Sequence, residues 1–86
     1  MPILKSDLLV DHGNSRIKWA LSGGGTWTPG DPIEARGKET DFSPLRGIEA
    51  LQRILVSNSA GPQALVCLED FCKGQWDLKP EILRAK

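Results

Sequence analysis

The chain has no tyrosine, a single histidine and two cysteines among its 86 residues. Aromatic residues make up only 6% of it, so three tryptophans and two phenylalanines are its large apolar anchors. A chain this short buries about 60–65% of the surface that it exposes when unfolded, which predicts one small domain with a thin core. Two cysteines and one histidine are too few for the usual four-ligand structural zinc site.

The chain also lacks a net charge, because eleven basic residues balance eleven acidic ones. Proteins that bind nucleic acid regardless of its sequence usually carry a basic excess, so we expect no nucleic-acid partner. No stretch approaches the roughly 18 apolar residues that cross a bilayer. The N-terminal apolar run is broken by Lys5 and Asp7, unlike a signal peptide. We therefore expect a cytoplasmic protein with no membrane partner.

Two apolar segments flank a turn near the N-terminus. Residues 7–11 form a short apolar run that ends in an acid, and residues 12–15 (HGNS) have turn chemistry. Residues 16–21 (RIKWAL) alternate with a period of two. This pattern predicts a β-hairpin over residues 6–21.

The next segment, residues 22–44, is rich in glycine and proline and is predicted to be a loop-rich region. The run Gly23–Gly25 breaks the second strand of the hairpin. Short strands are expected at residues 26–28 and, at an edge, at residues 33–37.

An α-β-α-β arrangement is expected over residues 45–86. Its first helix begins at Ser43-Pro44, which is typical of an N-cap followed by proline at the first helical position. Four apolar residues have helical spacing: Leu45, Ile48, Leu51 and Ile54. Gly47 weakens this helix.

A strand, a second helix and a last strand are expected after it. Residues 54–59 (ILVSNS) form a β-branched apolar run that predicts a buried strand. The second helix is expected at about residues 62–74, with Gly74 as its C-terminal stop. Residues 81–85 begin a strand. Because helices join parallel strands whereas the hairpin is antiparallel, the sequence predicts a mixed α/β sheet flanked by two helices.

The turn of the hairpin carries residues suited to a metal–phosphate site. Asp11 ends a strand and can hold Mg²⁺, usually through water, and the metal then bridges to phosphates. Gly13 allows close approach of the backbone, whose N–H groups can face phosphate oxygens. Asn14 and Ser15 can add donors, and Lys18 can reach a phosphate as a point charge. An ordinary hairpin turn, in which Asp11 bonds to its own loop, is the alternative.

The same segment, DLLVDHGNSRIKWAL, resembles the N-terminal phosphate-binding hairpin of type III pantothenate kinases. These belong to the superfamily of acetate and sugar kinases, Hsp70-type ATPases and actin, and their hairpin carries D-x-G-N-[ST]. The I-K-W sequence is similar to a subgroup that includes Bvg accessory factor-like proteins. ILVSNSAGP, residues 54–62, resembles the family strand that ends in S-[SN]-V-x-x-P. The resemblance implies a ribonuclease H-like (actin-like ATPase) N-terminal lobe.

The resemblance also implies roles for individual residues. Asp11 matches the aspartate that lies close to the metal and the ATP phosphates, so a catalytic and metal-binding role is expected for it. Nucleotide contacts are implied at six further positions: Gly13, Asn14, Ser15, Lys18, Ser57 and Asn58. Ser59 departs from the family pattern, which usually has valine at that position.

The activity that the resemblance implies is ATP-dependent phosphorylation of pantothenate, the first step of coenzyme A synthesis. Such an enzyme uses Mg²⁺ and a monovalent cation, K⁺ or NH₄⁺, and acts as a homodimer. The family's G-x-D-R region, with the aspartate proposed as general base, and its D-x-G-T motif do not occur in the chain. We therefore expect a truncated N-terminal portion that is inactive alone, with exposed apolar surface and an exposed final strand edge. The alternative is a non-enzymatic regulatory or protein-binding module of the same superfamily.

Other conspicuous residues are predicted to have structural roles. Trp19 and Trp27 are expected to pack in the core or at an edge, because the chain lacks the basic excess of a nucleic-acid binder. His12 occupies the variable position of the motif and is expected to be exposed. Cys67 and Cys72 are expected to be free, buried or half-buried thiols.

Overall fold

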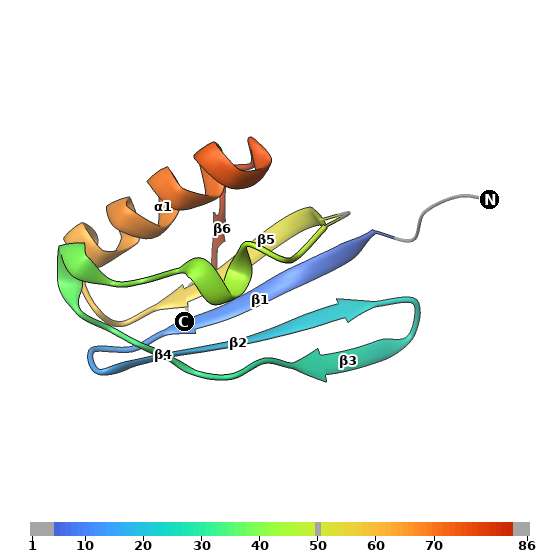
Figure 1. The fold of residues 1–86 in the computed structure, drawn as a ribbon, viewed down its shortest axis with the longest axis horizontal. Helices are drawn as coiled ribbons and strands as arrows, with labels where there is room; N and C mark the ends of the chain where they lie inside the picture. The colour runs from blue at the N-terminus through green and yellow to red at the C-terminus, as the bar shows by residue number, and fades with distance from the viewer. Residues whose placement is uncertain (1–4, 50, 84–86) are drawn as a thin grey trace.

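A computed structural model describes residues 5–49 and 51–83, which form a six-stranded sheet and one α-helix, α1 (Pro62–Trp76) (Figure 1). The strands are β1 (Ser6–His12), β2 (Arg16–Gly23), β3 (Thr26–Pro29), β4 (Ile33–Glu34), β5 (Leu51–Asn58) and β6 (Glu81–Ile82). They lie in the order β3-β2-β1-β5-β6, and β4 also pairs with β2. β1 is antiparallel to β2 but parallel to β5, and β5 is parallel to β6. The predicted mixed α/β sheet is confirmed.

The N-terminal hairpin is present where the alternation of residues predicts it. β1 and β2 are joined by the turn at residues 13–15, and the Gly13 N–H donates a hydrogen bond to the Arg16 carbonyl oxygen at 2.9 Å. A two-residue turn then joins β2 to β3. Its residues, Gly24 and Gly25, have φ values of 59° and 79°, which glycine adopts without steric penalty. β3 and β4 occupy the two predicted short strands, although β4 ends earlier than expected.

The helix predicted to begin at Ser43-Pro44 and to include Leu45, Ile48 and Leu51 is wrong. Between β4 and β5 the described residues form two short 3₁₀ turns, η1 (Gly37–Glu39) and η2 (Ser43–Leu45). β5 then begins at Leu51. The part of the chain that the structure describes therefore has one α-helix beside the sheet, not two, and residues 45–83 do not follow the predicted α-β-α-β order.

A β-bulge explains the helix-like spacing of Leu51 and Ile54. Ser6 of β1 pairs with Leu51 of β5, but the next residue of β1, Asp7, pairs with Arg53. One extra residue of β5 therefore lies between two successive pairs, as in a bulge. As a result Leu51 and Ile54, three positions apart, are 9% and 1% exposed. A regular strand would alternate with a period of two.

The second predicted helix is α1, and it is longer than expected. Gly74 does not end it, because the helix continues to Trp76. The indole Nε1 of Trp76 donates a hydrogen bond to the Ile48 carbonyl oxygen at 3.0 Å, which ties this last turn to the segment before β5. The helix ends at Asp77, whose φ of 56° is left-handed and whose N–H donates to the Lys73 carbonyl oxygen. The last predicted strand, 81–85, is present in part: β6 ends at Ile82, Leu83 lies beyond it, and residues 84–85 lie outside the described residues.

One face of the sheet packs against α1 and the irregular segment between β4 and β5, which lie on the same side of it (Figure 1). Buried residues of this covered face come from three strands: Leu8, Val10, Ile17, Ile54 and Val56. They form one core with four buried residues outside the sheet: Phe42, Leu45, Leu68 and Cys72. Burial raises the pKa of the Cys72 thiol to about 12, so Cys72 is an inert core residue. Both cysteines are free, as predicted.

The residues that alternate with these form the other face of the sheet, which we call the open face. An apolar cavity of about 330 Å³ lies on it, lined mainly by side chains of this face: Leu9, Ala20, Trp27, Pro29, Leu55 and Leu83. Trp27 is 61% exposed and Leu83 is 53% exposed, so the expected exposed apolar surface is present. Among the described residues, no helix combines the length and the apolar character needed to cross a membrane.

Candidate functional site

Three of the predicted site residues share one row across the sheet. Asp11 in β1 pairs with Lys18 in β2 on one side and with Ser57 in β5 on the other. Directly opposed residues of neighbouring strands project from the same face, so the three side chains lie together on the open face. The hairpin motif and the motif of residues 54–62 thus lie side by side, because β1 pairs with both β2 and β5.

A polar cavity of about 580 Å³ lies beside this row, at the turn between β1 and β2. Its lining combines predicted and unpredicted residues: Asp11, Gly13, Ser15, Arg16, Lys18, Glu34 and Ser59. Asn14 is exposed at the tip of the turn, outside this lining. The structure therefore brings together an acid, turn residues and a lysine, which are residue types suited to a metal–phosphate site.

The turn beside the cavity is closely packed. A Cβ atom on Gly13 would lie 3.0 Å from the Arg16 carbonyl oxygen, so this position favours glycine because of close approach, without a positive φ. The Gly13 N–H is used inside the turn, by the hydrogen bond to that same oxygen. The Ser15 carbonyl oxygen accepts a hydrogen bond from the Ala35 N–H at 3.1 Å, which fixes the end of β4 beside the turn.

The second motif contributes to the site through Ser59 more directly than through Asn58. Ser59 lines the cavity, and its N–H donates a hydrogen bond to the His12 carbonyl oxygen at 3.0 Å. The Asn58 amide instead bonds within the connection from β5 to α1, since its Nδ2 donates to the Gly61 carbonyl oxygen and its Oδ1 accepts from the Ala60 N–H. Asn58 therefore shapes the connection, and its contact with a nucleotide stays a prediction.

His12 is buried, and the expectation that it is exposed is wrong. β1 extends one residue further than predicted, so alternation turns the imidazole toward the core side of the sheet, where it is 2% exposed. Its Nδ1 has no hydrogen-bond partner among the described residues. Burial lowers the pKa of His12 from its ordinary value, so the imidazole is neutral at neutral pH. The buried neighbour of Asp11 is thus an uncharged group.

The charges around the cavity are unevenly paired. Glu34 accepts a hydrogen bond from Arg36 Nε at 3.1 Å, and this guanidinium holds the pKa of Glu34 below its usual value. The described residues contain two ion pairs, Arg36–Glu34 and Arg53–Asp7. The cavity residues Arg16 and Lys18 are in neither of them.

The sequence motif did not reveal Arg16 and Glu34 as site residues. Arg16 could have been found from its alternation with Lys18, which places both on one face of β2. Glu34 reaches the site only because β4 pairs with β2, with Glu34 opposite Arg16. A two-residue strand gives no sequence signal for that pairing.

The donor atoms of the cavity fit a magnesium ion that is held together with a phosphate ligand. Mg²⁺ is usually bound by one or two carboxylates plus substrate phosphates and water. Asp11 lines the cavity and could supply such a carboxylate, whereas the carboxylate of Glu34, which also lines the cavity, is paired with Arg36. Within residues 5–49 and 51–83, no group of three or more His, Cys, Asp or Glu side chains could hold a metal alone.

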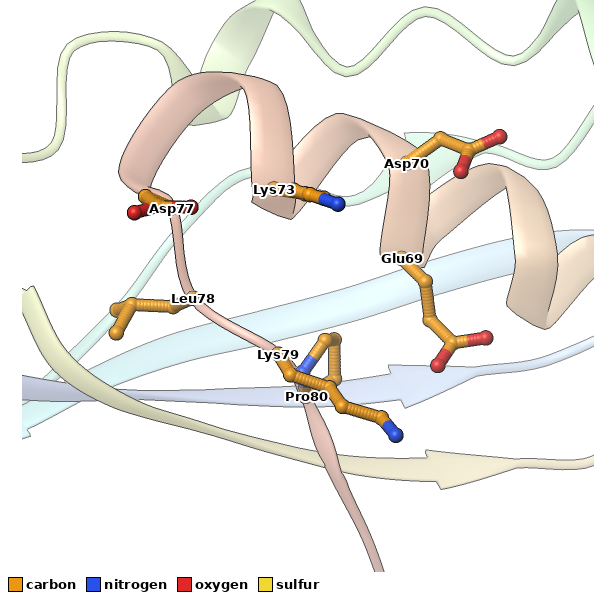
Figure 2. A pocket seen from close by; sticks show the side chains of 7 residues that line it. All are labelled: Glu69, Asp70, Lys73, Asp77, Leu78, Lys79 and Pro80. Carbon is orange, nitrogen blue, oxygen red and sulfur yellow. The ribbon is translucent and has the colours of Figure 1, made fainter.

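Another cavity, of about 380 Å³, lies between the C-terminal half of α1 and the segment that follows it (Figure 2). Three acidic and two basic residues line it with Leu78 and Pro80: Glu69, Asp70, Lys73, Asp77 and Lys79. Figure 2 shows that the three carboxylates point in different directions. The charged side chains of this cavity do not converge on one point, and none of the residues predicted for the phosphate site lines it.

A mixed α/β sheet that carries such a turn is compatible with the N-terminal lobe of a kinase. Comparison with known proteins points to a particular kinase family. Over 84 residues the chain is 38% identical to a type III pantothenate kinase of Nitrosococcus oceani, a match that covers 92% of the chain and 31% of that protein. Over 68 residues it is 39% identical to a type III pantothenate kinase of Marinobacter nauticus, and this match covers 74% of the chain and 26% of that protein.

The predicted resemblance to type III pantothenate kinases is thus confirmed over most of the chain. The chain spans about a quarter to a third of the length of these curated relatives. No protein-family model matches the chain.

Proposed function

We propose that the chain is the N-terminal, phosphate-binding part of a type III pantothenate kinase, with a ribonuclease H-like (actin-like ATPase) lobe. The observation that carries the proposal is that Asp11, Gly13, Ser15 and Lys18 all line the same polar cavity at the hairpin turn. The similarity to two proteins of that name supports it. The complete enzyme transfers a phosphoryl group from ATP to pantothenate, in the first step of coenzyme A synthesis.

In this proposal residues 6–21 hold the phosphates. Phosphoryl transfer depends mainly on positioning and on neutralising the charge of the transferred group. Asp11 helps to hold Mg²⁺, which supplies positive charge at the phosphates when bound. The turn residues Asn14 and Ser15 donate to phosphate oxygens, and Lys18 adds a positive charge.

The remaining roles complete the same proposal. Ser57, in the row with Asp11, contacts the nucleotide from β5, and Asn58 contributes from the connection between β5 and α1 that it shapes. The acceptor of the substrate proton belongs to the family's G-x-D-R region, so the 86-residue chain binds nucleotide without turning it over. The complete enzyme is a cytoplasmic homodimer that uses K⁺ or NH₄⁺ and has no nucleic-acid or membrane partner.

Chemical-shift mapping of the 86-residue chain with Mg·ATP tests the binding role. We expect shifts confined to residues 11–18 and 57–59, and we expect Asp11→Asn to abolish their magnesium-dependent part. Asp70→Asn, which removes an exposed acid of α1, is the matched control and should leave the shifts unchanged. No shifts at all would favour the alternative, a non-enzymatic protein-binding module.

An assay of ADP release tests the expected lack of turnover. The chain is incubated with ATP, Mg²⁺, K⁺ and pantothenate, and we expect no release above the rate without protein. Steady turnover would show that the chain holds a complete active site and would contradict its role as one part of a larger enzyme.

A further inference from the structure

Arg16 is a second cation in the cavity at the hairpin turn, and the family motif does not include it. It is the first residue of β2, it is exposed, and it lines the cavity together with Lys18. Residues two apart on a strand project from the same face, about 7 Å apart along it. The cavity therefore has two positive groups on one wall.

The acid nearest to Arg16 in the sheet forms its ion pair with another arginine, Arg36, although the charge of Arg16 also helps to lower the pKa of this acid. Glu34 lies directly opposite Arg16 in the pairing of β2 with β4, which makes it the natural partner of that guanidinium. Glu34 instead pairs with Arg36, through Nε at 3.1 Å and through Nη2. Within the described part of the chain, no acid lies within 4.0 Å of the Arg16 guanidinium.

From this arrangement we propose that Arg16 contacts a polyphosphate chain bound in the cavity, and that the Arg36–Glu34 ion pair keeps Arg16 free to do so. A guanidinium binds phosphate through two parallel hydrogen bonds, which a lysine cannot reproduce. A chain of two or three phosphates offers more oxygen atoms over a longer span than a single phosphate, so it can contact Lys18 and Arg16 at once. The inference rests on the proposed function for its ligand, the phosphate chain of a nucleotide.

The test measures the affinity of the 86-residue chain for inorganic tripolyphosphate and for Mg·ATP, by titration followed through amide chemical shifts. Arg16→Ala should weaken tripolyphosphate binding about tenfold, the loss expected for a charge-assisted bidentate contact. Orthophosphate, used as a probe in parallel, has fewer oxygen atoms to offer and should bind the unaltered chain more weakly than tripolyphosphate does. Arg46→Ala removes an exposed cation outside the cavity and should leave the affinity for tripolyphosphate unchanged.

Arg36→Ala tests the role of the ion pair. It should also weaken tripolyphosphate binding, because it releases Glu34 to pair with Arg16. The double variant Glu34→Gln with Arg36→Ala should restore the affinity, since Arg16 is then free again. In an Arg16→Ala background, Arg36→Ala should cause no further loss.

The outcomes separate this inference from the proposed function. If Mg·ATP shifts residues 11–18 but Arg16→Ala binds tripolyphosphate as well as the unaltered chain, the proposed function stands and the inference is overturned. If Arg16→Ala weakens tripolyphosphate binding but the unaltered chain does not bind Mg·ATP, the role of Arg16 stands and the proposed nucleotide-binding function is contradicted. No binding of tripolyphosphate at millimolar concentration, or an Arg36→Ala loss that Glu34→Gln does not reverse, overturns the inference.

Discussion

At the residue scale, the buried histidine beside the site couples stability to pH. The His12 imidazole is 2% exposed, and its Nδ1 has no hydrogen-bond partner among the described residues. A protonated imidazole at this position would be a buried charge without a counter-ion, which costs several kcal/mol in a protein interior. The folded state therefore favours the neutral form, and burial places the pKa of His12 below its ordinary value of 6.5.

We predict that the free energy of unfolding falls as the pH decreases below the ordinary histidine pKa of 6.5. The unfolded state then takes up a proton that the folded state does not bind, so stability is fully present above this pH and is lost as the pH falls toward the lowered pKa of the folded state. Urea unfolding at about pH 7.5 and about pH 5.5 measures the change.

His12→Gln provides the comparison, because glutamine is polar but does not titrate. The variant should be less dependent on pH over this interval than the unaltered chain, while the contribution of the carboxylates stays in both. Equal changes in the free energy of unfolding for the two proteins would show that His12 does not carry the effect.

At the scale of secondary-structure elements, α1 contains the glycine that the sequence suggested as its end. Gly74 is exposed, and a Cβ atom built on it meets nothing within 4 Å. Its φ is not positive, whereas Asp77, which does end the helix, has a φ of 56°. Gly74 is therefore an ordinary interior position of the helix, occupied by a poor helix former.

We predict that Gly74→Ala stabilises the chain by about 1 kcal/mol, the difference between glycine and alanine inside a helix. Gly61→Ala is the matched control, because Gly61 precedes the helix with a φ of 96°, and it should destabilise the chain by about 1–2 kcal/mol. Both values follow from urea unfolding curves. A destabilising Gly74→Ala would mean that α1 ends at Gly74 after all.

The success of sequence patterns at this scale depends on how local their cause is. The hairpin of residues 6–21 is predictable, because alternation and turn residues lie within one short segment. The helix expected after Ser43-Pro44 is wrong, in part because the spacing of Leu51 and Ile54 comes from a bulge that only the pairing with β1 creates. An interaction between distant segments leaves no local signal that separates a bulged strand from a helix.

The same distinction holds for the candidate site. One short segment, residues 11–18, contains Asp11, Gly13, Ser15 and Lys18, so their presence in one cavity could be anticipated. The share of Glu34 in the cavity depends on the pairing of β4 with β2, which sequence patterns do not encode.

At the scale of the whole molecule, the two faces of the sheet are unequal. The covered face holds the core, whereas the open face has an apolar cavity of about 330 Å³ that includes Leu9, Leu55 and Leu83. The chain has a formal net charge of zero, so little electrostatic repulsion opposes contact between the open faces of two chains. The open face therefore offers a surface to which apolar molecules are expected to bind.

We predict that the folded chain increases the fluorescence of anilinonaphthalene sulfonate, an anionic dye whose aromatic rings bind apolar surface, and that Leu83→Ser lowers this increase. Leu83 is 53% exposed and lines the open-face cavity, so its replacement should change the free energy of unfolding by no more than about 0.5 kcal/mol. Val66→Ser is the matched control, because Val66 is 52% exposed but lies on α1, outside this cavity. Dye titrations under native conditions, with urea unfolding to confirm equal stability, compare the variants. If Val66→Ser lowers the fluorescence as much as Leu83→Ser does, the dye does not select the open face and the prediction fails.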